Sequence, residues 1–143
     1  MSSFAHLADD GLTWQLLYTK PQAEAWVDAN LRRQGFVTLL PLMMKRASAA
    51  ALFPRYVFAG YTTAQRAEPF AGTYGVQYVV QCGGRPARVP RDVIVSIVER
   101  MDDRGIVRAE SLDAGETLFA VKARERVTIL AKFADSGFRV RAA

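Results

Sequence analysis

The hydrophobic pattern changes its period early in this chain. Over 14–18, large apolar side chains stand at every second position, and this alternation is typical of a half-buried β-strand. Thr19 and Gln22 then have the spacing of a capping box, and Pro21 suits a first helical turn because its missing N–H would be unpaired there. Apolar residues continue at helical spacing beyond this point. The sequence therefore predicts a strand followed directly by a helix over about 21–34.

The middle of the chain predicts an extended hairpin, a further strand and a second helix. The apolar run over 36–44 is interpreted as a strand that Pro41 bends or confines to a sheet edge. The chain returns as a strand over 52–61, in which Tyr56 and Phe58 share one face. We then expect a loop or short helix over 62–74, a strand over 75–81, a turn over 83–86 and a helix from Pro90, with Val93, Ile94, Ile97, Val98 and Met101 on one stripe.

The last part of the chain has a different character. Residues 107–114 are expected to be a linker, because the hydrophobic pattern lapses there. Residues 115–143 then hold three strand-like segments and no helix. Chains below about 40 residues rarely bury enough surface to fold alone, and three short strands leave edges that invite pairing with another chain. We therefore expect a small antiparallel β segment that packs on the preceding domain or pairs with a second copy to give a homodimer.

Composition narrows the classes of function. The chain carries 19 Lys and Arg against 14 Asp and Glu, a net charge of +5, which favours polyanionic partners without requiring them. Cys82 is the single cysteine, so an internal disulfide and a multi-cysteine zinc site are excluded. His6 is the single histidine and lies in the N-terminal leader, where it is poorly placed to activate a nucleophile. We expect no catalytic residue, no metal and no cofactor.

The N-terminal residues do not resemble a signal peptide, since they combine neither a basic region nor a long apolar run. No apolar stretch approaches the roughly 20 residues that a membrane-spanning helix needs. The sequence therefore predicts a cytoplasmic protein that has no membrane partner.

Several short strings resemble one family when they are taken together. They are Trp14-Gln15-Leu16-Leu17-Tyr18-Thr19-Lys20-Pro21, Leu40-Pro41-Leu42, Leu52-Phe53-Pro54-Arg55-Tyr56-Val57-Phe58, Gly75-Val76, Gly83-Gly84-Arg85-Pro86-Ala87 and Val89-Pro90. In this order and spacing they resemble the N-terminal domain of NusG-type transcription elongation factors. The resemblance implies an α+β fold with a central four-stranded antiparallel sheet flanked by helices. It divides the chain into a NusG N-terminal-like domain over 12–106, a linker over 107–114 and a truncated KOW-like segment over 115–143.

The resemblance also implies a partner. NusG-type domains dock on the clamp helices of the largest RNA polymerase subunit through an apolar patch on the sheet. Carried over to this chain, the patch comprises Phe53, Pro54, Tyr56, Phe58 and Tyr78. An exposed aromatic cluster is costly in a monomer unless a partner covers it. The alternative is that these aromatics are core residues beneath a helix.

A second implied partner is the non-template DNA strand in the elongation complex. Relatives of the RfaH kind grip this strand with basic residues along the first helix, and Lys20 matches that pattern while Asn30 and Tyr74 stand at neighbouring positions. Trp26, at helical spacing, is interpreted as a core residue. The predicted nucleic-acid-binding residues are Lys20, Asn30, Arg66, Tyr74, Arg85 and Arg88.

Three functions remain open on the sequence. The first is a specialised NusG paralogue that reduces pausing or termination, which the shortened tail favours because the usual Gly-rich turn between its strands is absent. The second is a general adaptor that couples polymerase to the ribosome or to a termination factor. The third is a plain nucleic-acid-binding module.

Overall fold

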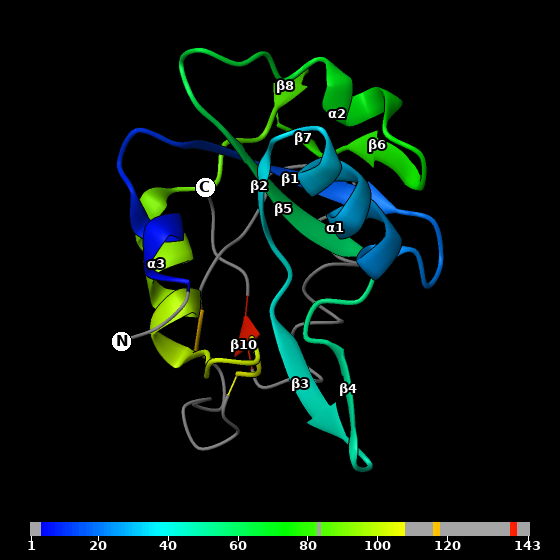
Figure 1. Cartoon of the computed structure of the whole chain (residues 1–143), viewed down its shortest axis with the longest axis vertical. Helices are drawn as coiled ribbons and strands as arrows, with labels where there is room; N and C mark the ends of the chain where they lie inside the picture. Colours follow the sequence, from blue (N-terminus) through cyan, green and yellow to red (C-terminus); the bar gives the residue numbers. More distant parts are fainter. Residues whose placement is uncertain (1–3, 83, 108–115, 118–137, 140–143) are drawn as a thin grey trace.

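A four-stranded antiparallel sheet forms the centre of the computed structural model, which describes residues 4–82, 84–107, 116–117 and 138–139. The strands are β1 (Thr13–Thr19), β2 (Val37–Leu39), β5 (Tyr56–Tyr61) and β6 (Val76–Val79). Their order in the sheet is β2-β5-β1-β6, and every pair is antiparallel (Figure 1). The predicted fold class is therefore confirmed for this part of the chain.

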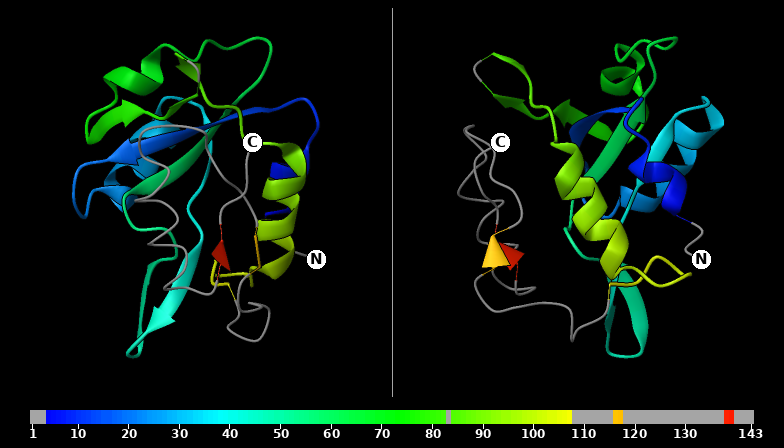
Figure 2. Two further views of the ribbon diagram at one scale, coloured as in Figure 1. Left: turned by 180° about the vertical axis from the view of Figure 1, so that it is seen from behind. Right: turned by 90° about the vertical axis from the view of Figure 1, so that its left-hand side faces the viewer.

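Helices cover both faces of the sheet. α1 (Glu24–Arg33) and α2 (Pro69–Gly72) pack on one face, where Val27 and Phe70 join the core. On the other face, α3 (Arg91–Arg100) and the short 3-10 helix η1 (Ala5–Ala8) complete a second core. The side view in Figure 2 shows α1 and α3 on opposite sides of the sheet. In the part of the chain that the structure describes, these helices are too short and too polar to traverse a bilayer.

The alternation in the sequence explains how β1 serves both cores. Trp14 and Leu16 point toward α3, whereas Leu17 points toward α1, because successive side chains of a strand project to opposite faces. The same rule places Phe58 in the α3 core and Val57 in the α1 core. The strand expected to be half-buried is therefore covered on both faces.

The first helix begins later than the sequence predicts. α1 starts at Glu24, its N-cap residue is Ala23, and no side chain caps it. Thr19 does not form the predicted capping box because it remains in the sheet, where its N–H donates to the Arg55 carbonyl at 2.8 Å. Gln22 adopts a positive φ of 61° in the intervening turn. The capping-box prediction is wrong, because Thr19 is hydrogen-bonded within the sheet and does not cap the helix.

Two hairpins extend from the sheet. Pro41 separates β2 from β3 (Leu42–Lys45), which confirms the predicted bend, and β3 pairs with β4 (Ser48–Ala51) as a ribbon that projects away from the sheet in Figure 1. β4 is therefore distinct from β5, although the sequence predicts a single return strand over 52–61. The second hairpin, β7 (Gln81–Cys82) with β8 (Arg85–Pro86), lies beyond β6 at the predicted turn.

The second helix matches its prediction closely. α3 follows Pro90, which is its N-cap residue, and the predicted apolar stripe is buried. Asp102 then organises the turn beyond the helix, where its carboxylate accepts hydrogen bonds from the N–H groups of Ile106 and Arg104. The Ile106 N–H is the main reason why the pKa of the Asp102 carboxyl is lowered. The ionised Asp102 carboxylate therefore stabilises the folded protein at any pH above the pKa that this group has in the unfolded chain. The stabilisation is lost as the pH falls through its lower pKa in the folded protein.

Only two short segments of the tail lie within the described residues. β9 (Glu116–Thr117) and β10 (Phe138–Arg139) pair with Phe138 opposite Glu116. The pairing is parallel, so the antiparallel arrangement expected for the tail is wrong for this pair. Residues 108–115 and the rest of the predicted β segment lie outside the described residues, and the homodimer stays a prediction.

Gly60 in β5 provides a test of the packing between sheet and core. A Cβ added there would lie 2.7 Å from Val37 Cγ2 and 3.2 Å from the Trp14 ring, whereas a Cβ at Gly72 would meet nothing within 4 Å. Overpacking of this kind costs about 1–3 kcal/mol, so Gly60→Ala should lower the free energy of unfolding by that amount. Chemical denaturation measures it, with Gly72→Ala as the control that stays near wild type. Equal stability of the two variants would contradict this packing.

Candidate functional site

An exposed aromatic cluster lies along α1 and comprises Lys20, Trp26, Asn30 and Tyr74. Trp26 is 54% exposed and Tyr74 is 72% exposed, and their rings meet edge to face with centroids 6.1 Å apart. Lys20 Nζ lies 5.6 Å from the centroid of the Tyr74 ring. Asn30 Nδ2 donates to the Tyr74 carbonyl at 3.3 Å. The structure therefore brings together three residues that the sequence predicted to contact nucleic acid.

The backbone beside Tyr74 allows this cluster to form. Gly75 has a φ of +96°, and a Cβ there would lie 2.8 Å from Val27 Cγ2. Only glycine accepts both the left-handed conformation and so close an approach to a helix. The Gly75 carbonyl also accepts a hydrogen bond from the Lys20 N–H at 2.9 Å. The end of β1 and the segment before β6 are thus tied to the same side of α1.

The sequence interpretation placed Trp26 in the core, and this is wrong, because Trp26 is exposed. The buried row of α1 contains Val27 and Leu31, which are fully covered by the sheet. Residues four apart share a helix face, so Trp26 and Asn30 form the next row, which turns toward solvent. The hydrophobicity of Trp26 favoured the core, whereas its position one residue before the buried row decides its exposure.

The exposed aromatic cluster has the chemistry of a single-strand contact. Aromatic rings stack on unpaired bases without regard to sequence, and a neighbouring cation adds attraction for the phosphate backbone. Asn30 adds an amide beside the rings, although its Nδ2 is already engaged with the Tyr74 backbone. The cluster can therefore hold a base by stacking and an adjacent phosphate through Lys20.

The predicted apolar patch is largely a core feature. Phe53, Tyr56 and Phe58 are each no more than 2% exposed and belong to the cluster beneath α3. The expectation that these three rings form an exposed surface is therefore wrong, and the alternative of core aromatics under a helix describes them. Of the remaining two patch residues, Pro54 is exposed and Tyr78 is half-buried.

A stack of tyrosines reaches the surface beside this core. Tyr18 is the cross-strand partner of both Tyr56 on β5 and Tyr78 on β6, and it lies 4.8 Å from Tyr78 in a stacked arrangement and 5.1 Å from Tyr56. The Arg55 guanidinium sits over the Tyr18 ring at 4.3 Å. We call Tyr18, Arg55 and Tyr78 the tyrosine stack. Neither Tyr18 nor Arg55 was predicted as a polymerase-binding residue, although the register of Tyr18 follows from the alternation over 14–18.

Arg55 is held in place by several bonds. Its Nε donates to the Thr19 carbonyl at 3.1 Å and its Nη2 to Gln77 Oε1 at 2.8 Å, while its backbone N–H donates to Glu24 Oε2 at 3.0 Å. Its φ of 75° lies in the left-handed region, which costs a non-glycine residue about 1–2 kcal/mol. The surrounding bonds offset this strain, so the guanidinium is presented over Tyr18 in one orientation.

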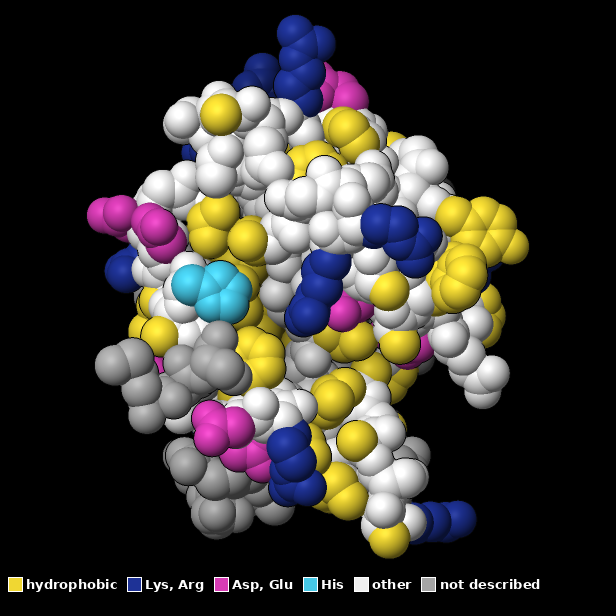
Figure 3. Space-filling model, viewed as in Figure 1, with side chains coloured by type: hydrophobic (Ala, Val, Ile, Leu, Met, Phe, Trp, Pro, Cys, Tyr) yellow, Lys and Arg dark blue, Asp and Glu magenta, His cyan; other side chains and the backbone are white. Residues whose placement is uncertain are grey.

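The remaining predicted cations come from different segments of the chain. Arg66, Arg85 and Arg88 are all exposed, and they come from the loop before α2, from β8 and from the segment after β8. On the face shown in Figure 3, Lys and Arg side chains are spread among hydrophobic and uncharged ones. A surface of this kind offers separate phosphate contacts rather than a continuous basic track.

No metal centre is found among the described residues, which hold no group of three or more His, Cys, Asp or Glu side chains suited to a metal ion. His6 is exposed on η1.

Comparison with known proteins gives one family. The family model described as "Transcription termination factor nusG" matches residues 12–98. Fifteen chains of solved structures match, among them one described as "Domain interaction in Thermotoga maritima NusG", with 21% sequence identity and a TM-score of 0.49. That match covers 62% of this chain, and this chain spans 56% of the length of the Thermotoga maritima chain. Comparison with curated proteins gives no match.

The two tryptophans allow the exposure of the aromatic cluster to be measured. Trp14 is 2% exposed and Trp26 is 54% exposed. Iodide should therefore quench the fluorescence of Trp26 and spare that of Trp14, and Trp26→Phe should abolish most of the quenching without lowering stability. Steady-state fluorescence with increasing iodide measures the quenching, and thermal denaturation measures the stability. Unchanged quenching in Trp26→Phe would contradict the exposed position of Trp26.

Proposed function

Because the family model covers residues 12–98 of the 143, this chain belongs to the NusG family of transcription factors, and we propose that it is a specialised member that reduces pausing or termination. In this proposal, residues 12–106 dock on RNA polymerase and contact the non-template DNA strand. Residues 107–114 act as a linker to a truncated KOW-like segment over 115–143. The protein acts in the cytoplasm by binding alone, without a cofactor or a catalytic step.

The observation that supports strand contact most directly is the exposure of two aromatic rings. Burying Trp26 and Tyr74 would gain hydrophobic free energy of about 25 cal/mol per Å² of apolar surface, yet both remain largely in solvent. Their rings touch, and Lys20 lies over one of them. Exposed rings next to a cation suit unpaired bases and their phosphates, which polymerase presents where the non-template strand is displaced.

The proposed polymerase-binding surface is the tyrosine stack with Pro54. Its rings are backed by the buried Phe53, Tyr56 and Phe58, so it presents a firm apolar surface with one oriented cation. Aromatic and arginine side chains supply most of the binding free energy at protein interfaces. We propose that this surface contacts the clamp helices of the largest polymerase subunit, with the three buried rings shaping it from beneath.

The two proposed surfaces meet at one end of β1. Tyr18 belongs to the tyrosine stack and Lys20 to the exposed aromatic cluster, and Thr19 between them is fully buried and bonded to Arg55. Docking at one surface therefore places the other at a fixed position beside the polymerase. This supports a factor that contacts polymerase and the displaced strand at the same time.

The modest net charge of the protein is consistent with DNA contacts that depend on docking to polymerase. A net charge of +5 with dispersed arginines supports few simultaneous phosphate contacts, and affinity for free duplex grows with the number of such contacts. We therefore propose that Arg66, Arg85 and Arg88 make auxiliary backbone contacts only once polymerase holds the protein in place.

The polymerase surface can be tested without unfolding the core. Tyr78→Ala should weaken binding to purified bacterial RNA polymerase roughly 30-fold, because an interface anchor contributes about 2 kcal/mol or more. Tyr56→Ala is unsuitable, since removing a buried aromatic side chain costs about 3–5 kcal/mol of stability. Biolayer interferometry with immobilised polymerase measures the affinity.

Tyr61→Ala is the matched control for this experiment. Tyr61 is also a half-buried tyrosine of the sheet, but it packs on the opposite face against Phe70, with ring centroids 5.8 Å apart. It should lose a similar amount of stability and keep wild-type affinity. Equal binding of the two variants to polymerase would rule out the tyrosine stack as the docking surface.

The strand contact has its own test. Tyr74→Ala should lower the affinity for a short single strand about tenfold, because base stacking on an aromatic ring contributes about 1–3 kcal/mol. Its stability should not change, since the ring is exposed. Fluorescence anisotropy measures binding, and Met44→Ala, which removes another exposed apolar side chain on the β3–β4 hairpin, should bind as wild type. Undiminished binding by Tyr74→Ala would remove the cluster from the proposal.

A further inference from the structure

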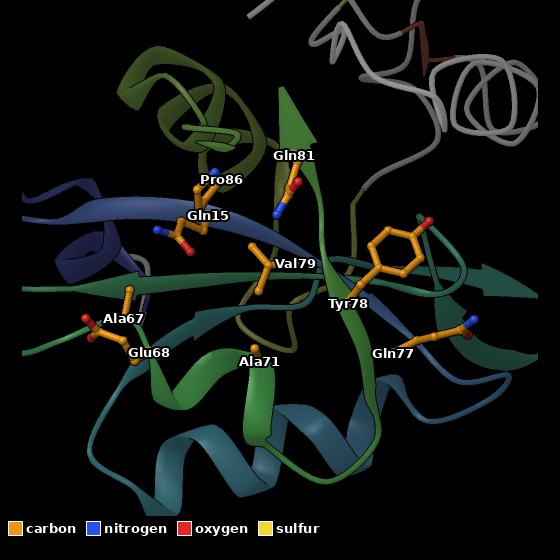
Figure 4. A pocket seen from close by; sticks show the side chains of 9 residues that line it. All are labelled: Gln15, Ala67, Glu68, Ala71, Gln77, Tyr78, Val79, Gln81 and Pro86. Carbon is orange, nitrogen blue, oxygen red and sulfur yellow. The ribbon is translucent and has the colours of Figure 1, made fainter. Parts of the chain in front are cut away.

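A cleft lies beside β6 and β7, and none of the residues of the exposed aromatic cluster lines it, whereas Tyr78 of the tyrosine stack does. Its volume is about 690 Å³, and it separates the end of β6 from α2 and the loop before it. Figure 4 shows Gln15, Val79 and Gln81 on one side of this space and Ala67, Glu68 and Ala71 on the other. The lining residues are Gln15, Ala67, Glu68, Ala71, Gln77, Tyr78, Val79, Gln81 and Pro86.

Gln15 is the unusual residue of this cleft. It stands on the central strand β1, only 7% of it is exposed, and it shares the sheet face of Leu17. Among the described residues, no side-chain hydrogen bond engages its carboxamide, which opens into the cleft. Gln15 is not among the residues whose buried polar atoms lack a hydrogen-bond partner, so solvent reaches its amide through the cleft. Both the donor and the acceptor of the carboxamide are therefore available to a ligand.

The neighbouring cations indicate what the ligand carries. Arg88 is the cross-strand neighbour of Gln15 through an antiparallel bridge, so the two side chains emerge on the same face. Arg85 precedes the lining residue Pro86 on β8, and both arginines are exposed. The residues that line the cleft include no cation and one carboxylate, Glu68. An uncharged part of a ligand therefore suits the cleft, and a phosphate group of the same ligand suits Arg85 and Arg88 outside it.

We infer that this cleft binds an unpaired nucleobase, and that Gln15 recognises adenine by donating to N7 and accepting from the N6 amino group. A glutamine carboxamide matches this pair of groups with two hydrogen bonds. Val79, Ala71 and Pro86 supply small apolar walls for the faces of the ring, and Arg88 takes the adjoining phosphate. The inference rests on the proposed function for its source of unpaired bases, but the site is separate from the exposed aromatic cluster.

The test compares two DNA oligonucleotides whose bases stack similarly but differ in one hydrogen-bond acceptor. Oligo-dA and oligo-7-deaza-dA have similar ring faces, but the second lacks N7. The intact protein should bind oligo-dA about tenfold more tightly, which corresponds to the discrimination of one bidentate amide–base pair. Fluorescence anisotropy without polymerase measures this ratio. Competition by free adenosine monophosphate shows whether a mononucleotide suffices or the base must belong to a strand, and either result supports the base site.

Gln15→Leu provides the decisive variant. It should bind the two strands equally and melt at the same temperature as wild type or higher, because no hydrogen bond ties the carboxamide to another described side chain and the position is largely buried. Gln15→Glu should also lose the preference, since it removes the donor to N7. Gln22→Ala, which removes an exposed glutamine outside the cleft, should retain it.

Two results would overturn the inference. One is an equal affinity of the wild-type protein for oligo-dA and oligo-7-deaza-dA. The other is a marked loss of thermal stability in Gln15→Leu, which would make the carboxamide a structural group. Neither result bears on the exposed aromatic cluster, because Tyr74→Ala tests that site in the same assay with a stacking readout.

Discussion

The burial of β1 on both faces is the constraint on which the rest of the structure depends. This strand pairs with β5 and β6 at its two edges, and its side chains enter the α1 core and the α3 core in alternation. Because an unpaired buried backbone group is costly, both edges must be paired and both faces must be covered. The sheet order and the placement of the helices on opposite faces follow from this single strand.

The proposed surfaces are consequences of how the chain leaves β1. Thr19 stays in the sheet, so α1 begins only at Glu24 and turns Trp26 outward beside the buried Val27. The same bond from Thr19 to the Arg55 carbonyl accompanies the left-handed backbone of Arg55, whose guanidinium covers Tyr18. Both the exposed aromatic cluster and the tyrosine stack therefore depend on one local feature, which is that Thr19 ends a strand and does not cap the helix.

The structure places polar groups where stability alone would not. Gln15 occupies a nearly buried position on the central strand, and Arg55 accepts backbone strain. Natural proteins keep such features when function requires them, and the remaining packing offsets their cost. The two apolar cores supply that packing in this protein, since large side chains such as Trp14 and Phe70 are almost completely buried.

The sequence by itself determined the main strands and helices, their order and the family, because hydrophobic periods and turn residues act over short distances. It predicted Lys20, Asn30 and Tyr74 as nucleic-acid-binding residues, and the structure brings these three residues together. Only the tertiary structure decided which apolar residues are exposed. Trp26 and Phe53 have similar hydrophobicity, yet the first lies beside the buried row of its helix and the second beneath α3. The role that we infer for Gln15 was equally hidden in the sequence, since a cleft arises from segments that only the folded sheet places side by side.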